Sequence, residues 1–362
     1  MRVMIQNRPR NLPWTGGDQI QEDATARWLE SLGVRVGRST EPEPNLVGYD
    51  LVHLFNLIGD WTVRQFRNAR RRGVPVVVST IYNPRQYALA SYAEQLEVVR
   101  GARMLLPNSR SEREKIEADF GRAAACAIVP NGIEPALLVE PSAAPWKRRD
   151  IALFVGRIDE RKRALELVRA WRDPRLGGRI PLVLCGHPFL RPYFEEVRAE
   201  AEHVNAATRA RCEASPPAGA AGAAAGAAAI HFAGEVPPEQ LASYYARARV
   251  FVLPSRLETP GLANLEAAAC GCALVAGECR DVSDYFGDLV RYCDGARPDD
   301  IAAKVLEAWE SPPDPKLAAL VRERYTWEAA ARATRDAYRA AFEMPAPNPA
   351  ALSAASTLAA AS

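Results

Sequence analysis

Two glutamates, Glu258 and Glu266, lie in the stretch FVLPSRLETPGLANLEAAACGCALVAGE and are separated by seven residues. Glu258 follows an apolar run that is typical of a strand, and Glu266 lies two turns into a predicted helix, about 10 Å along its axis. Carboxylates on either side of a phosphate-binding helix end suit a nucleotide linked to a sugar, with Glu258 on the sugar and Glu266 on the ribose. The alternative is that both are solvated helix carboxylates, which the spacing alone favours.

The start of the helix between these glutamates carries the phosphate-binding signal. Thr259 is predicted to be the N-cap and Pro260 the first helical residue, where no backbone N–H is needed. Gly261 has no side chain to block the approach of a ligand. The amides of Gly261, Leu262 and Ala263 are therefore expected to present free N–H groups to a phosphate at the positive end of the helix.

A second strand end carries two cations. The stretch IALFVGRIDERKRALELV predicts a strand, a glycine and a helix, with Arg157 and Lys162 in the turn. Each side chain is a candidate to bind a diphosphate through charge-assisted hydrogen bonds of about 1.5–3 kcal/mol. The alternative is solvated surface charge. It is weaker for Arg157, which directly follows the strand-end glycine, than for Lys162, which has an arginine on each side.

A pair of glycines, Gly16 and Gly17, follows the first predicted strand in WTGGDQI. They would allow the backbone to approach a phosphate from the first domain, or they form a simple tight turn. The fingerprint G-x-G-x-x-G is absent at this place, which argues against a nicotinamide-dependent enzyme.

Alternating strands and helices must position these residues. In the helix predicted over 18–33, the apolar residues Ile20, Ala24, Trp28 and Leu32 recur every four positions, and Gly33 ends it. Such alternation indicates α/β folding, with a parallel sheet covered on both faces. Apolar runs predict strands at 2–6, 49–57, 74–82, 102–109, 126–132, 151–156, 180–186, 229–234, 248–255 and 272–278.

The chain is expected to form two doubly wound domains, because its 362 residues exceed one simple core and the alternating pattern starts twice. Residues 1–145 form the first domain and 146–343 the second, joined by a Pro-, Ala- and charge-rich connection near 140–150. The carboxyl ends of the strands are expected to line the ligand-binding cleft. The alanine- and glycine-rich stretch 218–229 is predicted to be a surface excursion, and 344–362 a disordered tail.

The bulk composition excludes several classes of protein. Hydrophobic residues make up 48% and charged residues 25%, as in soluble globular proteins. A formal charge of +2 gives no electrostatic footprint for nucleic acid. No signal peptide or membrane span is expected. The seven cysteines lack metal-finger spacing and suit reduced thiols in a cytoplasmic protein, with a cluster of Cys270, Cys272 and Cys279 as a weaker, metal-binding alternative.

With these features in order, the chain resembles the retaining glycosyltransferases of family 4. These have the GT-B fold, in which two Rossmann-like domains face each other across a cleft. The last helix before residue 343 can then pack back on the first domain. The matching segments, which span nearly the whole chain, are Gly16-Gly17, VPNGIEP (129–135), FVGRIDERK (154–162), FAGEVPPEQLASYYARARVFVLPSRLE (232–258) and ETPGLANLEAAACGCALVA (258–276).

The resemblance implies roles for the residues around the diphosphate. The glutamate that matches Glu258 binds the donor sugar, and the one that matches Glu266 binds the ribose of the nucleotide. Arg157 and Lys162 match the cations that hold the diphosphate, and with Glu258 they are the residues expected to act in catalysis. Leu262 matches a position that presents its backbone amide to the diphosphate, and Gly261 before it does the same.

The resemblance also places the nucleotide base near Gly234, Glu235 and Val236. It implies transfer with retention of configuration, without a protein nucleophile, in which the leaving diphosphate accepts the proton of the acceptor. The protein then has to position the donor and stabilise charge on the leaving group. No metal cofactor is expected, and the absence of any Asp-x-Asp triplet agrees with this.

Three residues depart from the family pattern. Tyr82 in STIYN stands where the family commonly has a histidine near the donor sugar, so Tyr82 is a candidate for the sugar side. Arg163 replaces the usual glycine after the lysine, and Pro260 replaces the usual aromatic residue before Gly261.

The histidines and one arginine-rich helix give weaker signals. His53 lies in an apolar strand and is expected to be a hydrogen-bonded core residue. His187 follows a strand-end glycine and is a candidate for the sugar side, with a position in the cleft and a position outside it equally favoured. The helix 61–73 places Arg64, Arg67 and Arg71 on one face. This is expected to be a solvated face, with attachment to an anionic membrane surface as the alternative.

The sequence therefore predicts a retaining transferase that moves a sugar from a nucleotide-diphospho-sugar to a glycan, lipid-linked or small-molecule acceptor. It would lie in the cytoplasm or at the inner face of the membrane. The alternatives are another GT-B activity, namely a phosphorylase or a sugar-nucleotide epimerase, and a non-catalytic nucleotide-sugar-binding protein. The sugar, the base, the acceptor and the oligomeric state stay open.

Overall fold

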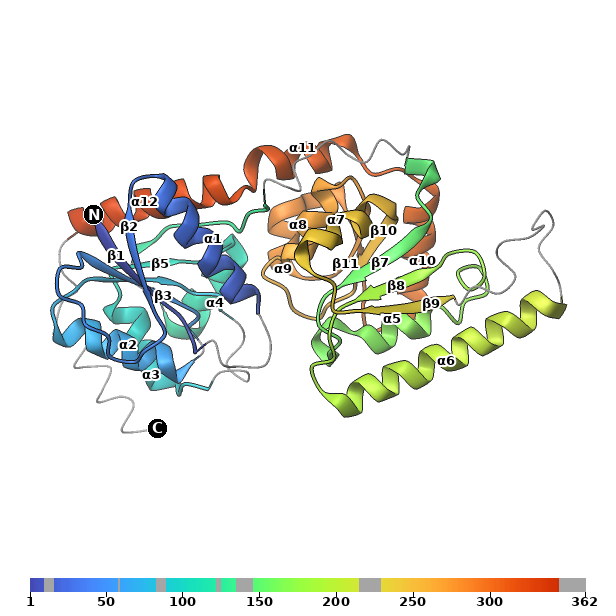
Figure 1. Ribbon diagram of the computed structural model, residues 1–362, viewed down its shortest axis with the longest axis horizontal. Helices are drawn as coiled ribbons and strands as arrows, with labels where there is room; N and C mark the ends of the chain where they lie inside the picture. Colours follow the sequence, from blue (N-terminus) through green and yellow to red (C-terminus); the bar gives the residue numbers. More distant parts are fainter. Residues whose placement is uncertain are drawn as a thin grey trace. The chain divides into compact units, whose positions relative to one another are not determined.

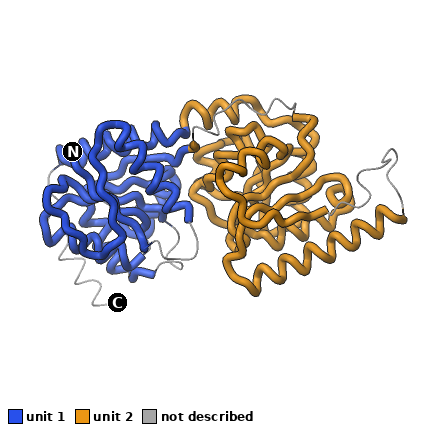
Figure 2. The backbone as a smooth tube through the Cα atoms, in the orientation of Figure 1, with its two compact units in different colours: residues 1–132, 325–362 blue, residues 133–324 orange. Residues whose placement is uncertain are grey.

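The computed structural model describes residues 1–9, 16–57, 59–82, 89–121, 125–134, 146–214 and 229–344 (Figure 1). The chain divides into two compact units, Met1–Gly132 with Tyr325–Ser362 and Ile133–Arg324 (Figure 2). The predicted domain boundary at 145, the predicted tail from 345 and nearly all of the predicted surface excursion lie outside the described residues.

The first unit is built on a parallel six-stranded sheet with the order β2-β1-β3-β4-β5-β6. The strands are β1 (Arg2–Gln6), β2 (Arg35–Ser39), β3 (Leu51–Phe55), β4 (Val76–Ser79), β5 (Met104–Leu106) and β6 (Ala125–Cys126). The helices are α1 (Gly17–Ser31), α2 (Asp60–Arg71), α3 (Tyr92–Gly101), α4 (Arg110–Phe120) and α12 (Trp327–Glu343). The last of these helices packs on α1.

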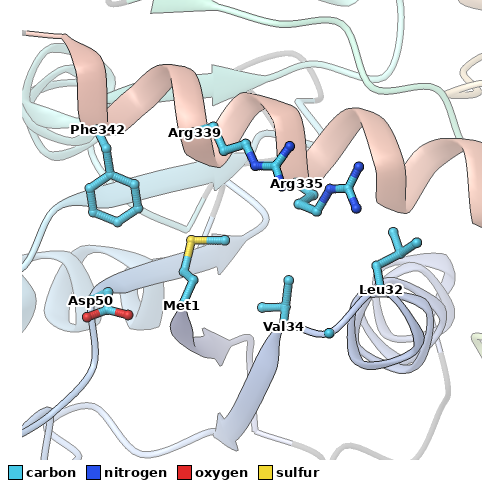
Figure 3. A pocket seen from close by; sticks show the side chains of 8 residues that line it. Met1, Leu32, Val34, Asp50, Arg335, Arg339 and Phe342 are labelled. Carbon is cyan, nitrogen blue, oxygen red and sulfur yellow. The ribbon is translucent and has the colours of Figure 1, made fainter.

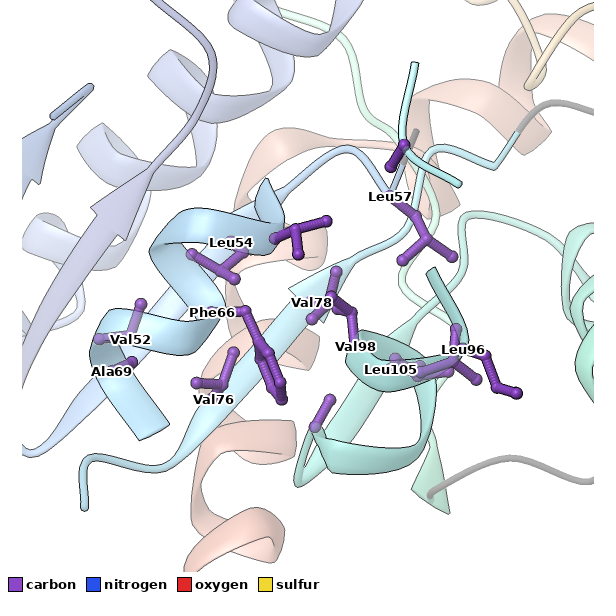
Figure 4. Close-up of a cluster of buried hydrophobic side chains, with 14 of the residues drawn as sticks. Val52, Leu54, Leu57, Phe66, Ala69, Val76, Val78, Leu96, Val98 and Leu105 are labelled. Carbon is purple, nitrogen blue, oxygen red and sulfur yellow. The ribbon is translucent and has the colours of Figure 1, made fainter. Parts of the chain in front are cut away.

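One part of the core of this unit lies on the face of the sheet that α2 and α3 cover. Every residue of β3 and β4 is buried, as expected for the central strands of a sheet covered on both sides. Figure 4 shows Phe66 of α2 among the branched side chains of these strands, with Leu96 and Val98 of α3 beside them. Burial of this apolar surface holds the unit together.

Helix α1 differs from the prediction in the face that it buries. Gly33 ends it as expected, with a φ of 81° that favours glycine. Ile20, however, is 41% exposed, while Gln21 and Glu22 are buried. These polar side chains are buried with hydrogen-bond partners: Gln21 donates to Asn108, which follows β5, at 2.9 Å, and Glu22 accepts from Arg38 of β2.

The second unit repeats the parallel α/β arrangement with the strand order β12-β11-β10-β7-β8-β9. Its strands are β7 (Ile151–Val155), β8 (Leu182–Cys185), β9 (Ile230–Gly234), β10 (Ala248–Leu253), β11 (Ala273–Gly277) and β12 (Arg291–Cys293). The direction of winding reverses between β7 and β10, so the carboxyl ends of these two strands form the place where open α/β sheets bind ligands.

Helices connect the strands of the second unit. Among the described residues, no helix combines the length and the apolar character needed to cross a membrane. The helical segments are η3 (Trp146–Arg148), η4 (Glu160–Lys162), α5 (Ala164–Ala170), α6 (Arg191–Ala214), α7 (Pro238–Arg247), α8 (Leu262–Ala269), α9 (Arg280–Phe286), η5 (Gly287–Leu289), α10 (Pro298–Glu310) and α11 (Pro315–Arg324).

Candidate functional site

The loop that carries Glu258 follows β10 and packs tightly on its neighbours. A Cβ atom on Gly277 would lie 2.2 Å from the carbonyl oxygen of Ser255, and one on Gly295 would lie 2.0 Å from that of Pro254. Any larger residue would push the loop away from the sheet. The two glycines therefore fix the position from which Glu258 projects.

A backbone hydrogen bond and an ion pair join this loop to the turn after β7. The N–H of Arg256 donates to the carbonyl oxygen of Arg161 at 2.8 Å. Next to this hydrogen bond, the Lys162 ammonium pairs with Oε1 of Glu258, and the two side chains are only 15% and 8% exposed. The structure thus brings together two of the residues predicted to act in catalysis, from positions 96 residues apart.

The second carboxylate oxygen of Glu258, which Lys162 does not contact, is available to a ligand. Oε2 of Glu258 accepts no hydrogen bond from any residue that the structure describes. The Lys162 ammonium has three donors and can hold Glu258 and a phosphate oxygen at once. The Lys162 backbone N–H is fixed by Asp159, whose carboxylate accepts it at 2.9 Å.

Arg163, a departure from the family pattern, occupies a left-handed backbone position with φ 53° and ψ 43°. Glycine adopts this conformation freely, whereas other residues pay about 1–2 kcal/mol. The Arg163 guanidinium lies 3.6 Å from the Asp294 carboxylate, an ion pair that helps to hold the turn. The turn therefore holds an arginine at a backbone position that favours glycine.

Arg157, the third predicted catalytic residue, is held between two neighbours. Its guanidinium pairs with the carboxylate of Asp159 at 3.1 Å and lies 4.6 Å from the ring centre of Phe189. A Cβ on Gly186 would lie 1.8 Å from the carbonyl oxygen of Gly156, so the ends of β7 and β8 meet at a contact that only glycine allows. These contacts fix the Arg157 guanidinium at the end of β7.

The helix start between the two glutamates differs from the prediction in its cap. Helix α8 begins at Leu262 with Gly261 as the N-cap, so the assignment of Thr259 as N-cap and Pro260 as first helical residue is wrong. The chain needs a φ of 85° to enter the helix, which Gly261 supplies and the preceding residues do not. Among the residues that the structure describes, none accepts a hydrogen bond from the amides of Gly261, Leu262 or Ala263.

Asn264 stabilises this helix start, and sequence reasoning missed it. Its side chain is fully buried, and its Nδ2 donates to the carbonyl oxygen of Pro260 at 2.8 Å. A Cβ on Gly261 would lie 2.9 Å from Oε2 of Glu258 and 3.0 Å from Nδ2 of Asn264. The glycine therefore lets the carboxylate and the free amides come close together. Asn264 gives no motif signal of its own, because an asparagine inside a helix is most simply explained as a surface residue.

Glu266, two residues after Asn264 on α8, has a partner that the sequence did not reveal. The buried hydroxyl of Tyr245 donates to its Oε2 at 2.6 Å. Burial raises the pKa of Glu266, the hydrogen bond from Tyr245 opposes this, and the nearby charge of Glu134 raises it further. The pKa of Tyr245 is in turn raised well above its usual value, chiefly by burial. One oxygen of Glu266 is thus fixed by Tyr245.

The segments after β8 and β9 lie next to each other. The N–H of Gly186 donates to the carbonyl oxygen of Gly234 at 2.7 Å. Glu235 is exposed and Val236 partly buried. His187 is partly exposed, with Nδ1 4.0 Å from the Glu235 carboxylate. The predicted base-binding loop and His187 therefore share one part of the second unit.

The remaining predicted residues, Gly16, Gly17 and Tyr82, belong to the first unit. Gly16 is the N-cap of α1 and Gly17 its first residue. Tyr82 is fully buried in the core of this unit, and its hydroxyl donates to the Asp119 carboxylate at 2.6 Å. This burial argues against a contact between the Tyr82 ring and a sugar.

His53 is a core residue, as predicted. Its ring is fully buried and bonded to the hydroxyl of Tyr338 at 2.6 Å and to that of Ser79 at 2.9 Å. Burial lowers its pKa to about 3, so the ring stays neutral at ordinary pH.

The arginine face of α2 carries little unpaired charge. Each of its three arginines pairs with a carboxylate, which is typical of a solvated face. The pairs are Arg64–Asp60 at 3.1 Å, Arg67–Glu97 at 2.7 Å and Arg71–Glu43 at 2.7 Å. In the described part of the chain, no group of three or more His, Cys, Asp or Glu side chains is arranged to hold a metal ion.

Comparison with known proteins identifies the fold of the chain and the type of domain in the second unit. The structure of sucrose-phosphate synthase from Thermosynechococcus elongatus matches with a TM-score of 0.74 at 18% identity, over 95% of this chain and all of that one. The chain therefore has the GT-B fold. Residues 149–311, which contain the Lys162–Glu258 pair and α8, match the family Glycosyl transferases group 1, so the second unit carries a glycosyltransferase domain.

Two curated relatives are named D-inositol 3-phosphate glycosyltransferase. The protein from Acidothermus cellulolyticus is 28% identical over 248 residues, which cover 63% of this chain and 52% of the relative. The protein from Nocardiopsis dassonvillei is 30% identical over 299 residues, covering 71% of this chain and 61% of the relative. The chain thus spans between half and two thirds of the length of these relatives.

Proposed function

We propose that this chain is a retaining glycosyltransferase of family 4 that transfers a sugar from a nucleotide-diphospho-sugar to a hydroxyl of an acceptor. The observation that carries this proposal is the Lys162–Glu258 pair next to the free amides of α8. A cation and a helix N-terminus suit a diphosphate, and a carboxylate oxygen without a partner suits a sugar hydroxyl.

Different side chains of the second unit bind the diphosphate, the sugar and the ribose of the donor. Lys162, Arg157 and the amides at the start of α8 stabilise the charge that develops on the leaving diphosphate. Glu258 orients the sugar through its Oε2, and Glu266 binds the ribose through the oxygen that Tyr245 leaves available. The leaving diphosphate takes the proton of the acceptor hydroxyl on the same face of the sugar, which retains the configuration. This reaction requires no metal ion, because cations and amides already neutralise the leaving group.

The acceptor is proposed from the names of the relatives alone. Two of them are named for transfer to an inositol phosphate. We propose a hydroxylated acceptor of that general kind, a polyol or glycan, and a cytoplasmic location where nucleotide-sugars are available.

Turnover with a panel of nucleotide-sugars tests the proposal. Incubation with UDP-, GDP- and ADP-sugars without inorganic phosphate should release nucleoside diphosphate slowly and with one donor preferred. Glu258→Ala should abolish the release with the fold intact, whereas Glu239→Ala, an exposed glutamate on α7, should not change it. Release that requires phosphate would indicate a phosphorylase, and binding without any release would indicate a non-catalytic protein.

A further inference from the structure

A cavity of about 420 Å³ lies in the first unit, at the edge of the sheet where β1, β2 and β3 begin. This edge is opposite to the carboxyl ends of the strands, so the cavity is separate from any site at those ends. Figure 3 shows the side chains of α12 on one side of it, with Met1 and Val34 on the other. Its volume is within the range of small-molecule sites.

The lining combines an apolar floor with two cations. Met1, Leu32, Val34 and Phe342 provide apolar surface, and Phe342 remains 45% exposed although it is a large aromatic residue. An apolar side chain that is left exposed beside a cavity can bury its surface against a ligand.

The cations are Arg335 and Arg339, one turn apart on the same face of α12. The carboxylate of Asp336 is their shared partner, at 3.6 Å from Arg335 and 3.7 Å from Arg339. One carboxylate at these distances makes no short hydrogen bond to either guanidinium. The two arginines and Asp336 together therefore carry a net charge of +1 on this side of the cavity.

One of these guanidiniums has an unsatisfied donor. The Nε of Arg335 is buried and has no hydrogen-bond partner among the residues that the structure describes. A buried charged donor without an acceptor is costly, so a small movement of the Arg335 side chain toward an oxyanion in the cavity would be favoured. Asp50, which also lines the cavity, keeps its negative charge although it accepts the backbone N–H of Arg2 at 2.7 Å, so an anion is favoured only at the end of the cavity that carries the two arginines.

We propose that this cavity binds a phosphate monoester with an apolar substituent. The phosphate lies between Arg335 and Arg339, where its several oxygens match two guanidiniums, and the substituent packs on Phe342 and Val34. Such a group occurs on soluble metabolites and on lipids at a membrane surface. The site is independent of the donor site and does not require the proposed transfer activity.

Calorimetric titration with hexyl phosphate tests the proposal, with inorganic phosphate and hexanol as the two separated halves of the ligand. Hexyl phosphate should bind more tightly than either half. The double variant Arg335→Gln/Arg339→Gln should lose at least about tenfold in affinity, because two charge-assisted contacts are removed. Arg332→Gln is the matched control: it lies on the same helix and pairs with Glu328 away from the cavity, so binding should not change.

Phe342→Ala tests the apolar half without risk to the fold, since the side chain is already half exposed. It should weaken hexyl phosphate and leave inorganic phosphate unchanged. Co-sedimentation with vesicles that contain phosphatidic acid then separates the sources: binding that the double variant abolishes indicates a lipid, and hexyl phosphate binding without co-sedimentation indicates a soluble ester. Absence of both, or affinity that is equal in the double variant and the wild type, would overturn the proposal.

Discussion

The ion pair between Lys162 and Glu258 offers the sharpest test of how the site is held together. Lys162→Met and Glu258→Gln each remove one charge and keep most of the side-chain volume. Because the side chains are only 15% and 8% exposed, either change leaves the other charge poorly solvated. The double variant removes both charges and should be less damaging than the two single changes added together.

The expected loss in the free energy of unfolding follows from the burial of the two side chains. Breaking a fully buried pair from one side costs about 3–5 kcal/mol, and the residual exposure here reduces this to about 2–3 kcal/mol. In a unit of this length, each 1 kcal/mol lowers the melting temperature by about 2–4 °C, so each single variant should melt roughly 5–10 °C lower. The coupling energy between the two positions should be about 1–2 kcal/mol.

The assay is urea unfolding followed by tryptophan fluorescence for the wild type, both single variants and the double variant. Arg247 and Asp150 form a control pair in the same unit, because their side chains are 57% and 60% exposed. The matching cycle at that pair should give a coupling below about 1 kcal/mol. Additive losses at Lys162 and Glu258 would refute the reasoning, since they would mean that the two charges do not stabilise each other.

Three further changes follow from the burial of polar groups. Tyr245→Phe removes the 2.6 Å hydrogen bond to Glu266 and should weaken a nucleoside diphosphate about fivefold, but not its dideoxyribose analogue; titration that shows equal losses would contradict this. Burial raises the pKa of Glu266 above its unfolded value, so its charged form lowers stability as the pH rises through the folded pKa. Glu266→Gln should therefore melt higher than the wild type at pH 8 and equally below about pH 4, and melting curves that differ by the same amount at both pH values would exclude this cause. Burial lowers the pKa of His53 to about 3. The neutral ring therefore contributes fully to the free energy of unfolding above pH 6.5, and this contribution falls by up to about 1.4 kcal/mol for each pH unit below that. His53→Gln should flatten this loss in urea unfolding between pH 5 and 7, whereas His203→Gln, at an exposed position, should keep the wild-type slope.

Much of the fold was predictable from local pattern, because buried parallel strands are continuous apolar runs. Nine of the predicted strands correspond to strands in the structure, whereas the strand predicted over 126–132 overlaps the two-residue β6 only at Cys126. The strands β2 and β12 were not predicted, since their sequences RVGRS and RYC lie at the edges of the two sheets and are only partly buried. Helix α1 shows the opposite limit: its buried Gln21 and Glu22 depend on partners distant in the sequence.

The candidate site also contains residues that local sequence predicts and residues that it does not. Strand-end glycines and the turn residues mark Arg157, Lys162 and Glu258 in the sequence, because the backbone geometry there restricts the residue type. The partners Tyr245 and Asn264 could not be found, because their roles depend on contacts across the fold. The helix start was misplaced by two residues, since a Thr-Pro cap and a glycine cap are equally compatible with the local sequence.

The central claim is that Glu258 binds the sugar of the donor and Glu266 its ribose. Calorimetric titration of the wild type, Glu258→Ala and Glu266→Ala with a nucleotide-sugar and with the matching nucleoside diphosphate tests it most directly. Glu258→Ala should lose the preference for the nucleotide-sugar and keep its affinity for the diphosphate, and Glu266→Ala should weaken both ligands by a similar factor. Unchanged affinity for both ligands in both variants would contradict the claim.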